Sequence, residues 1–257
     1  IQMVELTAVF SANGALAQTL PNWRARSQQL AMANAVTQAI QSNSVLLAEA
    51  GTGTGKTLAY LMPALLSGGK TVISTGTKAL QDQLFHRDLP AARRALKSPV
   101  SIALLKGRAN YVCKHYLQQN LASGRFANRD DAAWLAKIAR FAETSTSGDR
   151  AEATGIPEDA SAWHYAVSSR DNCLGSECSY YKNCFVMAAR KAALDAEVVV
   201  VNHHLFFADL WLKDEGVAEL LPACNTVILD EAHQLAETAA QFFGETVSTA
   251  QLLELSG

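Results

Sequence analysis

The chain contains the stretch Ala50-Gly51-Thr52-Gly53-Thr54-Gly55-Lys56-Thr57. A short apolar run at residues 45–49 precedes this stretch, and a helical pattern at residues 56–66 follows it. A strand, a glycine-rich loop and a helix in this order form a P-loop, in which main-chain N–H groups and the helix N-terminus cradle phosphates. A turn rich in glycine and threonine is the structural alternative. The stretch therefore predicts a nucleotide-binding domain.

The residues of this loop have separate expected roles. The glycines leave the main-chain N–H groups free to point at the β-phosphate of ATP. Lys56 is expected to reach the β- and γ-phosphates, and the hydroxyl of Thr57 is expected to ligate Mg²⁺. All eight residues, 50–57, are therefore predicted nucleotide contacts.

A second motif is the acidic pair that ends the apolar run at residues 226–230. Asp230 is expected to hold Mg²⁺, and Glu231 to polarise the water that attacks the γ-phosphate. An acidic strand end that only meets solvent is the alternative. His233 is expected to couple ATP hydrolysis to the rest of the motor protein. A histidine that only caps a helix or is buried is the alternative.

The pattern of the whole chain indicates an α/β fold. Runs of β-branched residues lie at 45–49, 71–75, 101–105, 198–202 and 226–230, and helical patterns lie at 27–41, 56–66, 78–96 and 190–195. Short strands that alternate with helices are typical of a parallel sheet with crossover helices. Four consecutive valines at 198–201 predict a strand that is covered on both faces.

The composition excludes several classes of protein. The net charge of −2 gives no general attraction to nucleic acid, so any such binding depends on local basic patches. No apolar run approaches the roughly 20 residues of a membrane helix, and the start shows no secretory signal, so we expect a cytoplasmic protein without a membrane partner. Five cysteines, an odd number, argue against a disulfide framework as the basis of the fold.

Four of the cysteines lie in a long interval without strand signals, roughly residues 107–187. An interval of this length predicts a subdomain inserted into the sheet. The four cysteines are Cys113, Cys173, Cys178 and Cys184. Four thiolates can close a tetrahedral site, and their spacing leaves zinc, an iron–sulfur cluster and free thiols open. Cys224 is expected to be a small buried apolar residue.

The motifs together resemble a known family. They comprise residues 49–57, 73–84, 104–111, 171–175 and 201–206, and the sequence Asp230-Glu231-Ala232-His233. This set resembles the iron–sulfur superfamily 2 DNA helicases, the XPD and DinG family, over essentially the whole chain. The resemblance implies a RecA-like P-loop motor domain and a [4Fe–4S] cluster on the four cysteines. It also implies ATP-driven 5′ to 3′ movement on single-stranded DNA and unwinding of forked DNA in repair or replication.

The resemblance also assigns roles to residues outside the glycine-rich loop and the acidic motif. Arg26 and Gln29 resemble the pair that reads adenine, with a polar helix start as the alternative. Thr75, Thr77 and Lys78 lie where such helicases contact the DNA backbone, and an ordinary helix N-cap is the alternative.

Three further residues at the entry to the insertion are expected to meet DNA. Lys106 and Arg108 would grip the phosphates of single-stranded DNA, and Tyr111 would stack on a base. A solvated loop is the alternative. The resemblance also implies a possible protein partner, the chi subunit of the replicative polymerase clamp loader.

The expected domain organisation follows from these assignments. Residues 1–106 form the first part of the motor domain, 107–187 the iron–sulfur insertion, 188–245 the remainder with the acidic motif, and 246–257 the start of an arch domain. The chain is thus expected to be a fragment of a helicase. Two rival functions stay open: a metal- or redox-responsive DNA-binding module with a vestigial P-loop, and a P-loop ATPase or nuclease partner whose cysteines bind zinc.

Overall fold

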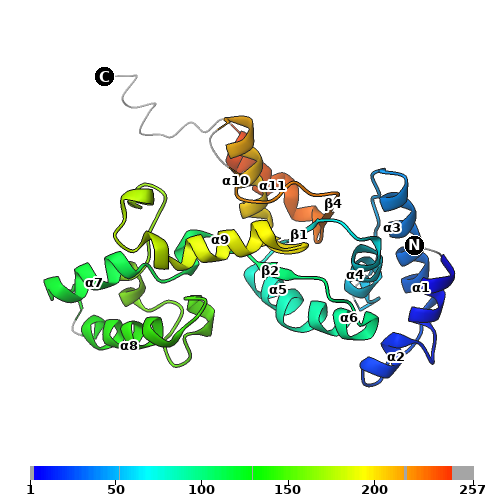
Figure 1. Cartoon of the computed structure of the whole chain (residues 1–257), viewed down its shortest axis with the longest axis horizontal. Coiled ribbons are helices and arrows are strands. Elements are labelled where there is room, and N and C mark those ends of the chain that lie inside the picture. The colour runs from blue at the N-terminus through cyan, green and yellow to red at the C-terminus, as the bar shows by residue number, and fades with distance from the viewer. Residues whose placement is uncertain (1–2, 52, 129, 217–218, 245–257) are drawn as a thin grey trace. The chain divides into compact units, whose positions relative to one another are not determined.

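The computed structural model describes residues 3–244, apart from residues 52, 129 and 217–218 (Figure 1). The chain divides into two compact units, one made of residues 1–103 and 196–257 and the other of residues 104–195. The domain boundaries expected at residues 107 and 187 stay predictions. The arch-domain start expected at residues 246–257 lies outside the described residues.

The sheet has four strands in the order β2-β3-β1-β4. They are β1 Thr71–Thr75, β2 Ile102–Leu104, β3 Val198–Asn202 and β4 Thr226–Leu229. β1 pairs in parallel with β3, with Thr71 opposite Val198, and in parallel with β4, with Thr71 opposite Thr226. Every residue of β1 is buried, including Ser74, as expected for a strand covered on both faces. The expected α/β fold with a parallel sheet is confirmed.

The strand predicted at residues 45–49 is wrong. These residues have no strand structure, and the side chains of Val45 and Leu47 are 99% and 89% exposed. An apolar run becomes a strand only where a neighbouring main chain completes its hydrogen-bond ladder, and these residues have no such ladder with the described chain. The sequence pattern indicated that these residues are apolar, but it could not show whether a neighbouring strand lies beside them.

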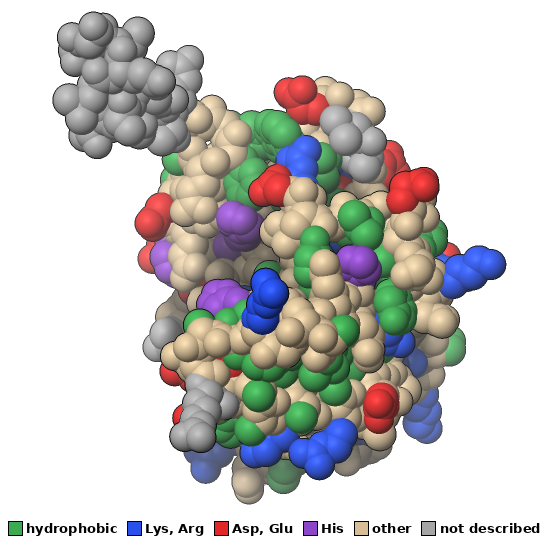
Figure 2. Space-filling view, turned by 90° about the vertical axis from the view of Figure 1, so that its left-hand side faces the viewer, with side chains coloured by type: hydrophobic (Ala, Val, Ile, Leu, Met, Phe, Trp, Pro, Cys, Tyr) green, Lys and Arg blue, Asp and Glu red, His purple; other side chains and the backbone are tan. Residues whose placement is uncertain are grey.

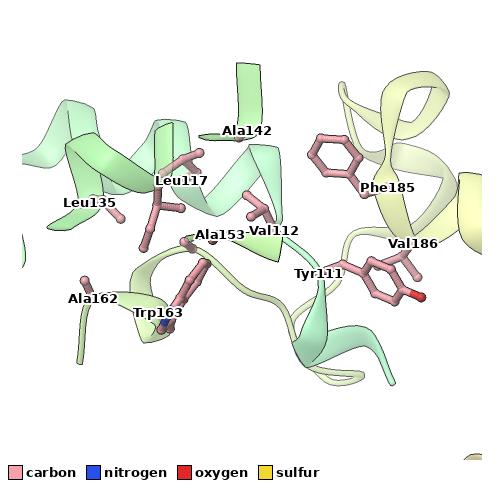
Figure 3. Packing of buried hydrophobic residues seen from close by; sticks show 12 residues of the cluster. Tyr111, Val112, Leu117, Leu135, Ala142, Ala153, Ala162, Trp163, Phe185 and Val186 are labelled. Carbon is pink, nitrogen blue, oxygen red and sulfur yellow. The ribbon is translucent and has the colours of Figure 1, made fainter. Parts of the chain in front are cut away.

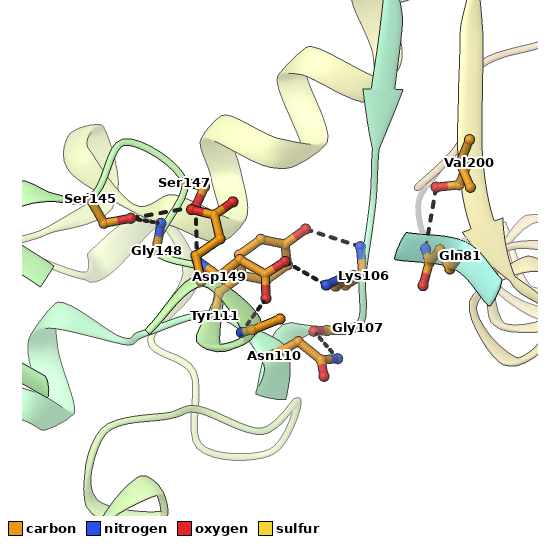
Figure 4. A network of polar contacts seen from close by, with 12 residues as sticks. Gln81, Lys106, Gly107, Asn110, Tyr111, Ser145, Ser147, Gly148, Asp149 and Val200 are labelled. Atoms are coloured by element: carbon orange, nitrogen blue, oxygen red, sulfur yellow. Dashed lines mark hydrogen bonds and ion pairs between the residues drawn. The ribbon is translucent and has the colours of Figure 1, made fainter. Parts of the chain in front are cut away.

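Helices account for most of the rest of the larger unit. They are α1 Met3–Phe10, α2 Ala15–Thr19, α3 Ser27–Gln41, α4 Lys56–Ser67, α5 Lys78–Gln83, α6 Leu89–Leu96, α10 His203–Asp214 and α11 Leu235–Phe243. α3 packs beside α4, and α10 packs beside α11 (Figure 1). Gln81 of α5 donates a hydrogen bond of 3.4 Å to the carbonyl of Val200 in β3, which fixes this helix to the sheet (Figure 4).

The helix expected at residues 78–96 is interrupted by one wider turn. The turn η1 Leu84–Asp88 has π-helical hydrogen bonding and joins α5 to α6. Pro90 follows at the start of α6 and has no N–H group to donate to the preceding turn. A π-turn is one way for a helix to absorb such a missing bond, so the proline accounts for the interruption.

The smaller unit is built from three longer helices and short 3₁₀ turns. The helices are α7 Lys114–Ser123, α8 Asp131–Thr144 and α9 Phe185–Asp195, and the turns are η2 Arg108–Asn110, η3 Arg150–Glu152, η4 Ser161–Tyr165, η5 Gly175–Glu177 and η6 Tyr181–Asn183. Its apolar core is a continuous cluster that includes Leu117, Leu135, Trp163 and Phe185 (Figure 3). Trp163 is buried, and its Nε1 donates to the carbonyl of Pro157 at 2.9 Å, so the indole loses no hydrogen bond on burial. The unit therefore has a core of its own.

A buried ion pair lies in the same unit (Figure 4). Lys106 Nζ and Asp149 Oδ2 are 2.6 Å apart, with side chains only 3% and 6% exposed. Tyr111 joins them, because its hydroxyl accepts a hydrogen bond of 3.0 Å from the main-chain N–H of Lys106 and its main chain forms an antiparallel bridge with Asp149. Removing one partner of a buried pair leaves an uncompensated charge, which is more costly than losing a surface pair.

None of the described helices has the length and apolar composition needed to cross a bilayer.

We predict that Asp149→Asn lowers the free energy of unfolding of this unit by about 3–5 kcal/mol, since it leaves the Lys106 ammonium buried without a counter-charge. Urea unfolding followed by tryptophan fluorescence measures the change. Asp159→Asn, at an exposed aspartate of the same unit, is the control and should shift the value by less than about 0.5 kcal/mol. Equal effects of the two substitutions would contradict the assigned role of the pair.

Candidate nucleotide-binding and cysteine sites

The glycine-rich loop leads directly into α4, as its sequence predicts. Gly53 and Gly55 have φ angles of +76° and +84°, which favour glycine because a side chain is strained there. The hydroxyl of Thr54 donates to the carbonyl of Gly51 at 2.8 Å and closes the turn. Thr52, also an expected contact, lies outside the described residues. The loop thus places main-chain N–H groups at the start of a helix, where anions bind.

Two residues from the start of α3 hold this loop from the side. Gln29 is buried and donates from Nε2 to the carbonyl of Gly55 at 2.8 Å, and Arg26 donates from Nη1 to the carbonyl of Gly53. The sequence singled out both residues as an adenine-reading pair. Their observed contacts are with the phosphate loop itself, so adenine recognition by Arg26 and Gln29 stays a prediction.

The lysine of the loop and the acidic motif meet in space. Lys56 Nζ lies 3.7 Å from Glu231 Oε1, and the two side chains are 29% and 30% exposed. The other oxygen of this carboxylate, Oε2, lies 3.5 Å from Nδ1 of His233. A half-exposed pair of this kind adds little stability, about 1 kcal/mol or less. Its significance is positional, since it brings together two residues that lie 175 positions apart in the sequence.

Asp230 is oriented by a residue that sequence reasoning missed. Tyr60 Oη donates to Asp230 Oδ2 at 3.1 Å, and the N–H of Glu231 donates to Asp230 Oδ1 at 3.1 Å. Burial, followed by the charge of Asp230, raises the pKa of Tyr60 well above its usual value, while the hydroxyl of Thr57 lowers it. Tyr60 therefore stays protonated and lies between the two residues expected to ligate Mg²⁺. Its position one helical turn after Lys56 was the available signal.

The segment expected to contact DNA follows β1. Thr75 is buried, and its hydroxyl donates to the carbonyl of Thr77 at 3.3 Å. Thr77 caps α5 by accepting from the N–H of Leu80 at 3.2 Å, which is the structural role considered for it. Thr77 and Lys78 are exposed, so their side chains are accessible to a ligand.

The residues expected to grip DNA at the entry to the insertion are arranged differently. Lys106 and Tyr111 are 4% and 3% exposed and belong to the buried network with Asp149. Arg108 donates from Nη1 to Sγ of Cys173 at 2.9 Å. These side chains form neither a solvated loop nor an accessible basic surface, and their contact with DNA stays a prediction that their burial does not favour. Figure 2 shows acidic and basic side chains interspersed on the described part of one face of the molecule.

All four cysteines of the insertion are half-buried free thiols. Cys113 precedes α7, and burial raises its pKa, with the nearby Cys184 adding to the shift. Arg190 is also half-buried; its pKa is lowered by burial and by Arg108 and raised by Cys173 and Cys184. Two guanidinium groups, those of Arg108 and Arg190, therefore lie near the sulfur atoms.

The thiol groups of the four cysteines are suitable ligands for a metal or cluster, but their positions in the structure do not form a ligand set. Soft thiolates are the ligands of zinc and of iron–sulfur clusters. Within the described part of the chain, however, no three cysteine, histidine or acidic residues are positioned to hold a metal ion. The expected cluster is thus not assembled in the structure, and it stays a prediction. Cys224 is half-buried, with its pKa raised by burial.

Comparison with known proteins identifies relatives of the chain. Residues 26–110 match the DEAD/DEAH box helicase family. The ATP-dependent DNA helicase YoaA of Haemophilus influenzae is 49% identical over 98% of this chain and 39% of its own length. The ATP-dependent helicase DinG of Mycobacterium tuberculosis (strain H37Rv) is 36% identical over 89% of this chain and 37% of its own length. The chain thus spans about two fifths of the curated relatives it matches.

One solved structure, described as an XPD helicase, covers 84% of this chain and 34% of its own length, with a TM-score of 0.48 and 17% identity.

We predict that Tyr60→Phe weakens the binding of a non-hydrolysable ATP analogue about tenfold when Mg²⁺ is present, since loss of an outer-shell hydrogen bond loosens the carboxylate that holds the ion. Without Mg²⁺ the affinity should stay unchanged, because Lys56 and the loop are intact. Isothermal titration calorimetry with and without Mg²⁺ makes the comparison. Ser67→Ala, which removes a hydroxyl that bonds within the same helix, is the control. An equal loss in both conditions would contradict the role of Tyr60.

Proposed function

We propose that the chain is the ATP-binding part of an ATP-dependent DNA helicase, because residues 26–110 match the DEAD/DEAH box helicase family and the chain is similar to the YoaA and DinG helicases over nearly its whole length. Its fold in this proposal is the RecA-like motor domain. The helicase activity is proposed for the whole protein, because this chain spans only about two fifths of the length of its curated relatives.

One observation carries the proposal more than any other. Lys56, at the start of α4, and Glu231, directly after Asp230 at the end of β4, meet at 3.7 Å. A γ-phosphate bound between them would have a cation on one side and a carboxylate that can orient water on the other. This is the arrangement that hydrolysis of ATP requires, and a vestigial P-loop would have no need to keep it.

Each residue then has a defined task. The loop N–H groups and Lys56 bind the phosphates, and Glu231 orients the attacking water and accepts its proton. Thr57 and Asp230 would hold Mg²⁺, which neutralises charge on the phosphate oxygens. Tyr60 keeps the Asp230 carboxylate in one orientation. His233, beside Glu231, is placed to sense the state of that carboxylate.

DNA is the proposed macromolecular partner, supported by the names of the relatives. Thr77 and Lys78 are accessible and can contact phosphates without reading sequence. Movement in the 5′ to 3′ direction, forked substrates, a role in repair or replication and a cytoplasmic location are finer proposals supported by the resemblance alone. Association with the chi subunit of the clamp loader rests on the same support, and no described residue identifies its surface.

We also propose a [4Fe–4S] cluster on the four cysteines of the insertion. Their thiolate chemistry and the two nearby guanidinium groups support it. When bound, a cluster cross-links the segments that carry its ligands. Arg108 and Arg190 would hold positive charge beside the ligating sulfurs.

We predict that Lys56→Ala in the full-length protein lowers ATP hydrolysis stimulated by single-stranded DNA at least a hundredfold, because charge on the transferred phosphoryl group loses its main cationic partner. Steady-state phosphate release measures it. Lys191→Ala, at an exposed lysine of α9, is the matched control and should keep the wild-type rate. Activity that survives Lys56→Ala would favour the rival DNA-binding module.

We predict about four irons and four acid-labile sulfides per chain in protein purified without oxygen, and their loss in Cys178→Ser. Elemental analysis and the visible spectrum give the result independently of enzyme activity. Cys224→Ser, outside the four cysteines, should keep the full content. One zinc per chain, or no metal in folded anaerobic protein, would contradict the cluster and leave the ATP site unaffected.

A further inference from the structure

A buried histidine lies directly behind the acidic pair. His203 begins α10 immediately after β3 and is 1% exposed. Asn202 caps the helix by accepting from the N–H of Leu205 at 2.8 Å, which fixes the direction in which the imidazole leaves the main chain. Nδ1 of His203 lies 2.6 Å from Oγ of Ser74, a fully buried residue of β1. The ring thus connects the ends of two neighbouring strands.

The other nitrogen of this ring is buried without a hydrogen bond. Nε2 of His203 makes no hydrogen bond of good geometry with the described residues. Burial lowers the pKa of His203, and weak hydrogen bonding to the main chain of Asp230 and Glu231 opposes this shift. The imidazole is therefore neutral, with one N–H group. If Nδ1 accepts from the Ser74 hydroxyl, the N–H is at Nε2 and faces main-chain carbonyl groups that could accept it.

One of the two residues whose main chain lies near this ring has a strained backbone. Glu231 has a φ of +56°, in the left-handed region that disfavours residues other than glycine. Strained backbone of this kind is frequent at active sites and at segments that switch conformation. A small rotation of the main chain at Asp230 and Glu231 would relieve the strain and could bring a carbonyl onto Nε2. One movement would then remove both unfavourable features.

A second contact joins the same two segments. A Cβ atom added at Gly76 would collide with Oε1 of Gln234, so the side chain of Gln234 packs directly on the main chain of Gly76. The N–H of Asp230 also donates to the carbonyl of Ser74 at 2.8 Å. The segment at residues 74–78, which carries Thr77 and Lys78, therefore contacts residues 230–234 at two points.

We infer that His203 is a positioning residue that ties the segment at residues 74–78 to the acidic pair: Nδ1 holds Ser74, and Nε2 donates to a main-chain carbonyl of Asp230 or Glu231 in the arrangement that hydrolyses ATP. The inference rests on the proposed function. DNA bound at Thr77 and Lys78 then favours the hydrolysing position of Glu231 through a short, buried connection. Coupling of this kind is reciprocal for binding, so nucleotide should also tighten the grip on DNA.

The two bonds of the imidazole can be separated by substitution. In His203→Asn the side-chain amide reaches the place of Nδ1 and can accept from Ser74, but nothing occupies the place of Nε2. In His203→Gln the longer amide reaches the place of Nε2 and can donate there. Ser74→Ala removes the hydroxyl alone. His204→Asn is the matched control, because His204 is the exposed neighbour whose ring packs on Phe242 at 4.7 Å.

The test measures ATP hydrolysis by the full-length protein with and without a single-stranded oligothymidine, together with the affinity for an ATP analogue and the melting temperature. We expect His203→Asn to lower the stimulation by DNA at least about tenfold while analogue affinity and melting temperature stay near wild type. His203→Gln should retain more stimulation than His203→Asn, and His204→Asn should keep the wild-type ratio.

Two results overturn the inference. Unchanged stimulation in His203→Asn would exclude a role for Nε2. Rates that fall equally with and without DNA, in step with the melting temperature, would assign the residue to packing alone. Failure of the proposed function looks different, because wild-type protein would then hydrolyse no ATP or respond to no DNA, and both proposals would fall together.

Discussion

The parallel pairing of β1 with β4 is the constraint on which the candidate site depends. It sets Thr71 opposite Thr226, and it continues one residue beyond β4, where the N–H of Asp230 donates to Ser74. Because parallel strands end at the same edge of a sheet, the acidic pair and the segment after β1 are brought to one place. A slip of one residue would turn Asp230 to the opposite face. The position of Asp230, the carboxylate proposed to hold Mg²⁺, is thus decided by main-chain hydrogen bonds.

Two ion pairs of the chain differ in burial and therefore in what they contribute. The Lys106 and Asp149 pair is shielded from water and holds the smaller unit together, so each partner depends on the other. The Lys56 and Glu231 pair is half-exposed and weakly held, which leaves both groups able to exchange each other for phosphate and water. The same two kinds of side chain therefore serve stability in one unit and binding in the other.

The site combines satisfied and unsatisfied polar groups. Asp230 has a hydrogen bond at each carboxylate oxygen, and the glycines of the loop supply positive φ angles at little cost. Glu231 and His203 differ, since one has a strained backbone and the other a buried nitrogen without a partner among the described residues. Such features are rare in folded proteins, and their presence beside the carboxylate proposed to orient water fits the proposed change of arrangement at this site.

The sequence by itself determined the phosphate loop, the acidic pair, the parallel α/β class and most strand and helix positions, because these are local: glycine spacing, β-branched runs and helical periodicity act within a few residues. It did not determine that residues 45–49 have no strand partner in the described part of the chain, or that Lys106 and Tyr111 are buried. Nor did it determine that Tyr60 and His203 lie beside Asp230. Those facts depend on which distant segments meet. Only the tertiary structure decided them, since a ladder, an ion pair or a hydrogen bond needs both of its partners in place.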